Sequence, residues 1–170
     1  MILYYGSNVE IEKIDLGRCR PYKDFGKGFY TSLLREQAWT MAKRTVRIYG
    51  NGVPCITAFS FEDSFFQDTS LNIRRFDNPD KEWARFVMNN RNCGFEDRQS
   101  RDCNIDSKYD IVIGPVANDD IAALIDIFFA GLISDDALTK ELTFRNLSSQ
   151  VSFHTEKSVA RLRKTGAFHG

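Results

Sequence analysis

The order in which strand-like and helical segments follow one another is the feature that most constrains the fold of this chain. Short apolar or alternating runs typical of strands occupy residues 2–5, 55–61, 109–113 and 150–154. Helical patterns fall between them without a regular spacing. A doubly wound sheet requires repeated strand–helix–strand units, which this order does not supply. The sequence therefore predicts an α+β fold.

Each expected helix begins at a residue whose side chain can accept a hydrogen bond from the first turn. These residues are Ser32, Asn78, Asn118, Ser134 and Thr155. Pro79 directly follows one of them and suits the first helical position. The first helix is expected to end near Gly50, because glycine is the common residue after a helix end. The last, a basic helix, is expected to run through Lys164.

Composition favours one globular domain over residues 1–170. Hydrophobic residues make up 42% of the chain and include 14 phenylalanines, enough for one packed core. Lysine plus arginine and aspartate plus glutamate both total 23, so no net charge attracts nucleic acid or an anionic membrane. The longest apolar run, Ile121 to Ile133, is shorter than the roughly 20 residues that span a bilayer. With no charged leader at the N-terminus, we expect a cytoplasmic protein without membrane contact.

The cysteines and histidines do not form a recognisable metal or disulfide pattern. The cysteines, at positions 19, 55, 93 and 103, are scattered and lack a C-x-x-C pair. His154 and His169 are the two histidines of the chain. We therefore expect free structural thiols and no bound metal. His154 is expected to be a structural imidazole on its strand.

The stretch "DFGKGFYTSLLREQA", residues 24–38, is the strongest candidate for a ligand site. Its two glycines allow the backbone to approach a ligand closely, and the ring of Tyr30 can lie flat on a planar group. A phosphate-binding loop would need a Ser or Thr after the lysine, and a dinucleotide fingerprint would need a third glycine. The alternative is a tight turn that places Phe29 and Tyr30 in the core.

Four segments in order carry a resemblance to a known group of enzymes. They read "LYYGS" at 3–7, "DFGKGFYTS" at 24–32, "YDIVIGPVAND" at 109–120 and "SSQVSFHT" at 148–155. The first, second and fourth of them, in this order, resemble the motifs of ADP-ribosyltransferases, and the third looks like a segment of the bacterial family named next. More closely, the chain resembles a bacterial family, domain of unknown function 3990, with an ADP-ribosyltransferase-like fold. This resemblance implies two small facing β-sheets, surrounding helices and a cleft for NAD.

The resemblance also implies roles for individual residues. The backbone of Gly6 would hold the nicotinamide carboxamide, Tyr30 would stack on the nicotinamide ring, and Gln150 would bind the ribose hydroxyls. The catalytic set is Gln150, Tyr30 and Tyr5. The NAD-binding set is Tyr5, Gly6, Ser7, Gly28, Phe29, Tyr30 and Arg91. Arg91 either holds the pyrophosphate or complements a helix dipole.

By the same resemblance, the chain would transfer ADP-ribose from NAD to a protein or nucleic acid, as a toxin neutralised by a small antitoxin protein. Two positions depart from the usual pattern, because Tyr5 replaces a histidine and Gln150 a glutamate. A neutral amide orients a ribose but does not oppose a developing positive charge as a carboxylate does. A module that binds NAD, ADP-ribose or a protein without turnover is therefore the alternative, and an NAD glycohydrolase is another. A glutamate at position 150 is expected to preserve or raise NAD cleavage.

Overall fold

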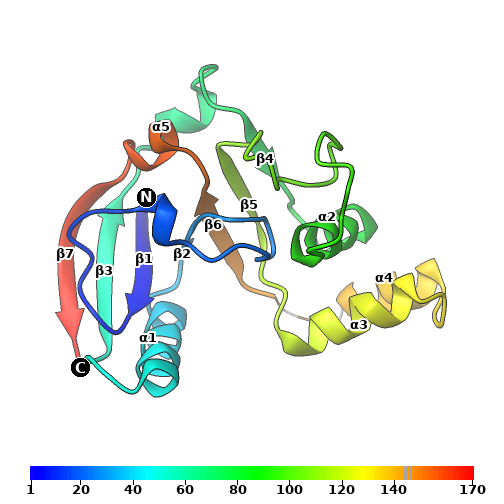
Figure 1. Ribbon diagram of the computed structural model, residues 1–170, viewed down its shortest axis with the longest axis horizontal. Helices are drawn as coiled ribbons and strands as arrows, with labels where there is room; N and C mark the ends of the chain where they lie inside the picture. Colours follow the sequence, from blue (N-terminus) through cyan, green and yellow to red (C-terminus); the bar gives the residue numbers. More distant parts are fainter. Residues whose placement is uncertain (144, 146) are drawn as a thin grey trace.

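Strands from the whole length of the chain join in one sheet, in which β1 (Ile2–Ser7) lies two places from the edge strand β7 (Arg163–His169). The computed structural model describes residues 1–170 except Phe144 and Asn146. Within that part of the chain, seven strands are hydrogen-bonded in the order β4-β5-β6-β2-β1-β3-β7 (Figure 1). The other strands are β2 (Phe29–Ser32), β3 (Cys55–Ser60), β4 (Ile73–Arg75), β5 (Ile111–Pro115) and β6 (Ser149–Phe153). All neighbours are antiparallel except β4 and β5.

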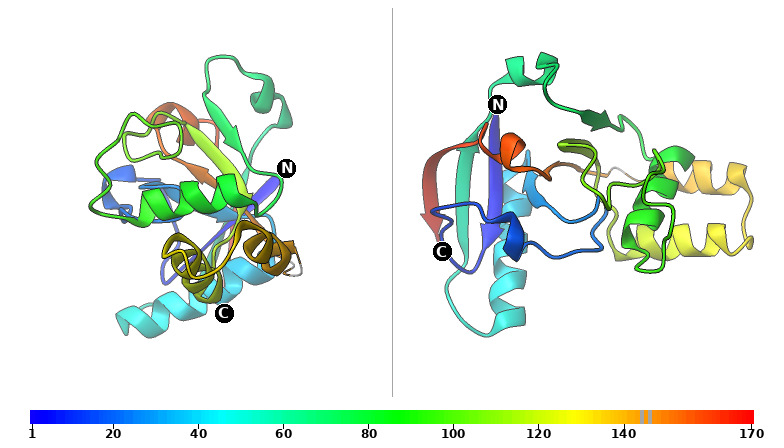
Figure 2. Two further views of the ribbon diagram at one scale, coloured as in Figure 1. Left: turned by 90° about the vertical axis from the view of Figure 1, so that its right-hand side faces the viewer. Right: turned by 45° about the horizontal axis from the view of Figure 1, so that its top comes forward.

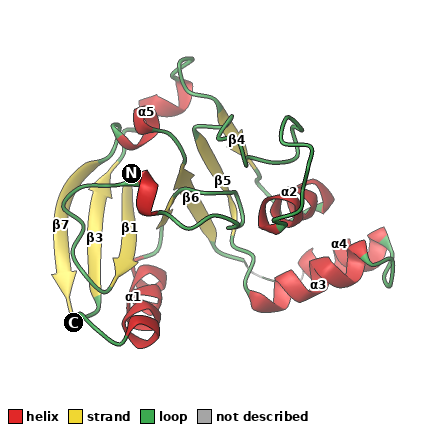
Figure 3. Ribbon diagram, in the orientation of Figure 1, coloured by secondary structure: helices red, strands yellow, loops and turns green. Residues whose placement is uncertain are grey.

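The single sheet corrects the prediction of two facing sheets. Strand β1 pairs with β3 along its whole length, but its register with β2 consists of the pair Tyr4–Ser32. This short contact joins two halves, β4-β5-β6-β2 and β1-β3-β7 (Figure 3). The predicted mixture of helices and strands is confirmed, whereas the two halves are parts of one hydrogen-bonded sheet.

Helices cover this sheet at separate places. The longest, α1 (Arg35–Tyr49), packs on β1, and α2 (Lys81–Arg91) packs with α3 (Asp119–Phe129) and α4 (Asp135–Thr143). Helices α3 and α4 form a hairpin at the end of the molecule opposite β7 (Figure 2). The short α5 (Glu156–Val159) lies between β6 and β7. No helix in the described residues is long and apolar enough to cross a membrane.

Two hydrophobic clusters fill the core, and the alternation of side chains along β2 separates them. Phe29 belongs to a cluster with Leu3, Phe59 and Phe153, against which Tyr5 also packs. The neighbouring Tyr30 instead packs against a cluster that includes Phe25, Trp83, Phe86, Val112 and Ile125. Successive residues of a strand point to opposite faces, so this aromatic pair contributes one ring to each cluster.

The expected helix starts are partly confirmed. The side chain of Asn118 accepts from the backbone N–H of Ile121 at 3.0 Å, and Gly50 ends α1 with a left-handed φ of 67°. The predicted cap at Asn78 is wrong, because Asp80 caps α2 by accepting from Trp83 N–H at 2.9 Å. Asp80 can do so because Pro79 precedes the helix instead of opening it.

The largest error concerns the C-terminal segment. Thr155 caps a helix as predicted, but that helix ends at Val159, and the expected helical residues up to Lys164 lead into strand β7. Strand β7 pairs along the full length of β3, from Cys55–His169 to Ser60–Arg163. Pairing with a buried neighbouring strand outweighs the local helix preference of this basic segment.

Candidate functional site

Gln150 lies on the central strand β6, where its side chain is buried beside three other segments. In the ladder it stands opposite Ser32 of β2 and Gly114 of β5. Directly opposed residues of antiparallel strands point to the same face, so Gln150 and Tyr30, two positions from Ser32, lie on one face of the sheet. The structure therefore brings together two of the residues predicted to be catalytic.

Asp24 is the centre of the polar contacts on this face. Its Oδ2 accepts from Gln150 Nε2 at 2.8 Å and from the backbone N–H of Ala117 at 3.0 Å. Its Oδ1 accepts from Arg91 Nε at 3.0 Å and Nη2 at 2.6 Å. The four hydrogen bonds use both oxygens, which allows the carboxylate to be buried. We call Asp24, Tyr30, Arg91 and Gln150 the Asp24 cluster.

Arg91 is the last residue of α2 and faces the Asp24 carboxylate instead of solvent. Besides its two bonds to Asp24, its Nη2 donates to the carbonyl of Ala117 at 2.6 Å. Its side chain is 32% exposed, compared with 10% for Asp24. Helix α2 thus brings a partly accessible guanidinium to the cluster, the group that binds pyrophosphate well. The negative end of the α2 dipole also favours a positive side chain at this position, in addition to the direct hydrogen bonds of Arg91.

Tyr30 is anchored through its hydroxyl to the glycine turn before it. The hydroxyl donates to the carbonyl of Gly26 at 2.7 Å and accepts from the N–H of Phe25 at 2.9 Å. Burial, followed by the nearby Asp24 charge, holds the pKa of the phenol well above its usual value. The phenol is therefore neutral, and its ring is fixed against Phe25 and His154, with centroids 6.3 Å and 6.0 Å away.

Gly28 leaves the space that the buried His154 occupies. A Cβ on Gly28 would lie 2.6 Å from Nδ1 of His154. This Nδ1 donates to the carbonyl of Lys27 at 2.8 Å, and Nε2 faces the hydroxyl of Ser152 at 2.8 Å. Burial lowers the pKa of His154 to about 4, so the imidazole is neutral at pH 7. Both ring nitrogens have polar neighbours, as the structural interpretation of His154 predicts.

The remaining predicted residues lie away from the Asp24 cluster. Tyr5 stacks on Phe29 with centroids 4.3 Å apart, on the other side of the sheet from Tyr30. Gly6 faces α1, where a Cβ would lie 1.8 Å from the carbonyl oxygen of Ala38. Ser7 is buried at the end of β1. The structure therefore brings together Tyr30, Arg91 and Gln150, but not the side chain of Tyr5.

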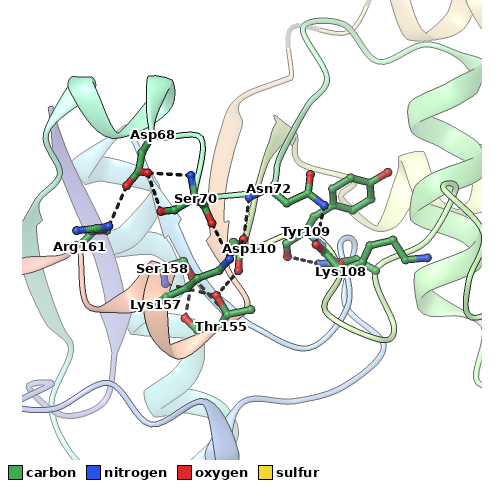
Figure 4. Close-up of polar contacts among 11 residues, drawn as sticks. Asp68, Ser70, Asn72, Lys108, Tyr109, Asp110, Thr155, Lys157, Ser158 and Arg161 are labelled. Carbon is green, nitrogen blue, oxygen red and sulfur yellow. Dashed lines mark hydrogen bonds and ion pairs between the residues drawn. The ribbon is translucent and has the colours of Figure 1, made fainter.

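A second buried aspartate, Asp110, organises a separate polar network (Figure 4). It accepts from the N–H of Asn72 at 2.7 Å, the hydroxyl of Thr155 at 2.6 Å and Nζ of Lys157 at 2.8 Å. Burial alone would raise the pKa of Asp110, but the bonds from Lys157, Thr155 and Asn72 lower it. Through these contacts Asp110, which directly precedes β5, links that strand to the start of β4 and to the cap of α5. Its partners, unlike those of Asp24, include no predicted site residue.

Sequence reasoning missed Asp24 as a site residue, although it opens the "DFGKGFYTS" segment. An acidic residue directly before a turn of glycines is usually solvated, so its burial was not evident. What identifies Asp24 as a site residue is its pairing with two distant candidates, Arg91 and Gln150. That pairing becomes visible only when the chain is folded.

Two cavities, of about 440 and 580 Å³, are lined by described residues. The first lies between α1 and β7, next to Trp39 and Phe168. The second lies between the start of α2 and the end of α4, and Pro115 and Ser149 line it beside Gln150. Neither is lined by Tyr5, Tyr30 or Gln150 itself. Nowhere in the described part of the chain do three His, Cys, Asp or Glu side chains gather as a metal site requires.

A family model described as "Protein of unknown function (DUF3990)" matches residues 1–163. The chain belongs to this family. The resemblance to family 3990 is thereby confirmed, and the Asp24 cluster lies within the matched DUF3990 region. No curated protein and no solved structure matches the chain significantly. Membership of the DUF3990 family itself names no activity.

Proposed function

We propose that this protein transfers ADP-ribose from NAD to a macromolecular acceptor, on an ADP-ribosyltransferase-like fold. The observation that carries the proposal is the meeting of three distant segments. The turn before Tyr30, the end of α2 at Arg91 and strand β6 at Gln150 are linked through Asp24. Tyr30 and Gln150 are the residues that the ADP-ribosyltransferase resemblance assigns to the nicotinamide and its ribose.

The chemistry of the transfer suits these side chains. The bond between nicotinamide nitrogen and ribose C1′ breaks, its electron pair leaves with nicotinamide, and C1′ becomes cation-like. The acceptor then forms a bond to C1′ and loses its proton. An enzyme must hold the dinucleotide in position and stabilise that charge. Tyr30 supplies an aromatic ring for the nicotinamide, Arg91 a guanidinium for the pyrophosphate, and Gln150 an amide for the ribose hydroxyls.

The divergence of β1 from β2 supports the same location for the nicotinamide. If the register of Tyr4–Ser32 continued, Gly6 would stand opposite Tyr30, but the two strands do not pair there. Gly6 pairs with Ile56 of β3 on its other side. The side of β1 that faces β2 beyond Tyr4 is therefore where we propose that the carboxamide binds, as the resemblance implies. The proposed site uses this backbone and not the phenol of Tyr5, which stacks on Phe29.

We further propose that the transferase acts as a toxin that a small antitoxin protein neutralises. This part rests on the family resemblance alone. The acceptor is a protein or a nucleic acid. Incubation of the protein with labelled NAD in a lysate, followed by separate protease and nuclease digestion, distinguishes the two. Release of label by one digestion identifies the acceptor class, whereas nicotinamide release without any labelled macromolecule indicates an NAD glycohydrolase.

A binding module without turnover is the second candidate, because Gln150 is neutral, buried and already bonded to Asp24. Calorimetry with millimolar NAD and ADP-ribose, together with nicotinamide release, separates the candidates. Binding without release favours the module. If the folded protein binds neither ligand and releases no nicotinamide, the proposed function is wrong.

Substitution of Gln150 tests the proposed catalytic role. Gln150→Ala is expected to lower nicotinamide release at saturating NAD by about a hundredfold and to weaken NAD binding far less, since its bonds to ribose tighten in the transition state. Gln99→Ala, at an exposed position, is the matched control and should leave both unchanged. Equal rates in all three proteins would remove Gln150 from the site.

Substitution of Tyr30 tests the nicotinamide contact. Tyr30→Ala is expected to abolish NAD binding, whereas Tyr30→Phe should keep the dissociation constant within about threefold, because stacking uses the ring face. If Tyr30→Phe binds as poorly as Tyr30→Ala, the hydroxyl and not the ring is required. Thermal unfolding of both variants identifies a loss of binding that arises from unfolding.

A further inference from the structure

The contacts of Gln150 determine which way its amide faces. Nε2 lies 2.8 Å from Asp24 Oδ2 and 3.4 Å from the carbonyl oxygen of Pro115. Both neighbours only accept hydrogen bonds, so the atom between them must be the donating NH₂ group. Oε1 is then the other branch of the amide and can only accept. No residue that the structure describes donates to it.

The partner that orients this amide is a charged one. A hydrogen bond from an amide N–H to a carboxylate is stronger than one to a neutral acceptor. It also polarises the amide, because hydrogen bonds strengthen one another along a chain, and electron density moves towards Oε1. Arg91 binds mainly Oδ1 of Asp24, so Oδ2 remains for Gln150 and Ala117. Gln150 thus presents an acceptor oxygen with part of the negative character of a carboxylate.

We propose, resting on the proposed function, that Asp24 is a positioning residue for ADP-ribose transfer. It fixes the Gln150 amide with Oε1 towards the ribose and, through that amide, supplies negative charge opposite the developing cation. The Asp24–Gln150 pair would then replace the glutamate that standard transferases carry. This role explains why the acid of the "DFGKGFYTS" segment and the amide of the "SSQVSFHT" segment meet in the fold.

The same geometry reverses the expectation for Gln150→Glu. A carboxylate at position 150 would place an oxygen at the position of Nε2, 2.8 Å from Asp24 Oδ2. Two like charges at that distance cannot both ionise freely, so the pair would retain a proton with a raised pKa. We expect Gln150→Glu alone to release nicotinamide more slowly than wild type at pH 8. The deficit should shrink as the pH falls towards 5.5, because the pair then holds its proton.

An exchange of charge between the two positions tests the proposal. Asp24→Asn should lower nicotinamide release at saturating NAD by about tenfold, with the NAD dissociation constant within about threefold of wild type. The double variant Asp24→Asn/Gln150→Glu moves the carboxylate to position 150 and lets the new side-chain amide at position 24 donate to it. It should recover wild-type release to within about threefold and lose the pH dependence of Gln150→Glu. Asp106→Asn, at an exposed position, is the control.

The outcomes separate this proposal from the function on which it rests. Wild-type rates in Asp24→Asn, or a double variant no better than Asp24→Asn, would overturn the role of Asp24 and leave the transferase standing. A wild-type protein that neither binds NAD nor releases nicotinamide would overturn both. If Asp24→Asn does not fold, as circular dichroism would reveal, the pH profile of Gln150→Glu decides. A deficit that does not change with pH would count against the proposal.

Discussion

The two buried aspartates of this molecule have similar surroundings but different partners. The side chains of Asp110 and Asp24 are 4% and 10% exposed, and each accepts hydrogen bonds from backbone and side chains. The partners of Asp110 are the backbone N–H of Asn72 at a strand start, the Thr155 helix cap and Lys157, and none of them is a predicted site residue. The partners of Asp24 are the backbone N–H of Ala117 and the side chains of Arg91 and Gln150, and both side chains were singled out for ligand chemistry.

This difference teaches how to separate a structural polar network from a candidate site. A network that joins backbone groups and caps completes the folding of the elements around it. The network of Asp24 instead joins two predicted site residues, one of them a partly exposed arginine, and is therefore a candidate site. His154 lies between the two, because its backbone N–H donates to the carbonyl of Asp110 while its ring contacts Tyr30. Substitutions in each region should therefore have separable effects.

The largest expected effect is on stability, at Asp110. Asp110→Ala removes the acceptor of Asn72, Thr155 and Lys157, and should lower the free energy of unfolding by about 3 kcal/mol. Urea denaturation measures the loss. Asp77→Ala, which removes an exposed ion pair with Arg75, should change it by less than about 0.5 kcal/mol. If the two variants are equally stable, Asp110 is not a structural anchor.

The second effect is the pH dependence of stability that His154 produces. Its pKa of about 4 in the folded protein lies below the ordinary value of about 6.5, so unfolding takes up a proton as the pH falls. The contribution of this pKa difference to the free energy of unfolding is complete above about pH 7 and is lost as the pH falls towards 4. From pH 7 to 5 this amounts to about 2 kcal/mol.

Comparison with a variant isolates this contribution. His154→Gln should be less stable than wild type at pH 7, and the difference between the two proteins should narrow towards pH 5. Denaturant unfolding at a series of pH values provides the measurement. A difference that stays constant between pH 7 and 5 would show that His154 does not titrate differently on unfolding.

The third effect belongs to the Asp24 cluster. Tyr30→Phe removes one donor and one acceptor at the turn, leaving Gly26 and Phe25 without their hydroxyl partner, and should cost about 1 kcal/mol of stability. Thermal unfolding measures it, with Tyr4→Phe on β1 as the control. A variant as stable as wild type would mean that the hydroxyl does not hold the turn.

The smallest effect is expected on the other side of the sheet. Tyr5→Phe retains the ring that stacks on Phe29, so stability should change by less than about 0.5 kcal/mol. Nicotinamide release should also stay within about twofold of wild type, because the proposed site lies with Tyr30. A larger loss of release without a loss of stability would return Tyr5 to the catalytic set that the resemblance implies.

Local sequence features identified several elements because their causes are local. The cap at Asn118 and the left-handed end at Gly50 depend on nearby residues, and the structure has both. The strand predicted at 150–154 is present at Ser149–Phe153, but it is buried on both faces and its burial does not alternate. The strand β7 was missed because its stability comes from pairing with β3, more than 100 residues away in sequence, as the pair Ser60–Arg163 shows. The single sheet was missed for the same reason, since the Tyr4–Ser32 contact joins its halves.

The sequence by itself determined a mixed helix and strand composition, the ends of several helices and membership of the DUF3990 family. It also singled out Tyr30, Arg91 and Gln150 as individual candidates. Only the tertiary structure decided that Arg91 and Gln150 meet at Asp24, on the face of the sheet that also carries Tyr30, and that the side chain of Tyr5 lies on the other face. The physical reason is that burial and hydrogen bonding between distant segments depend on strand register, which fixes the face each side chain occupies.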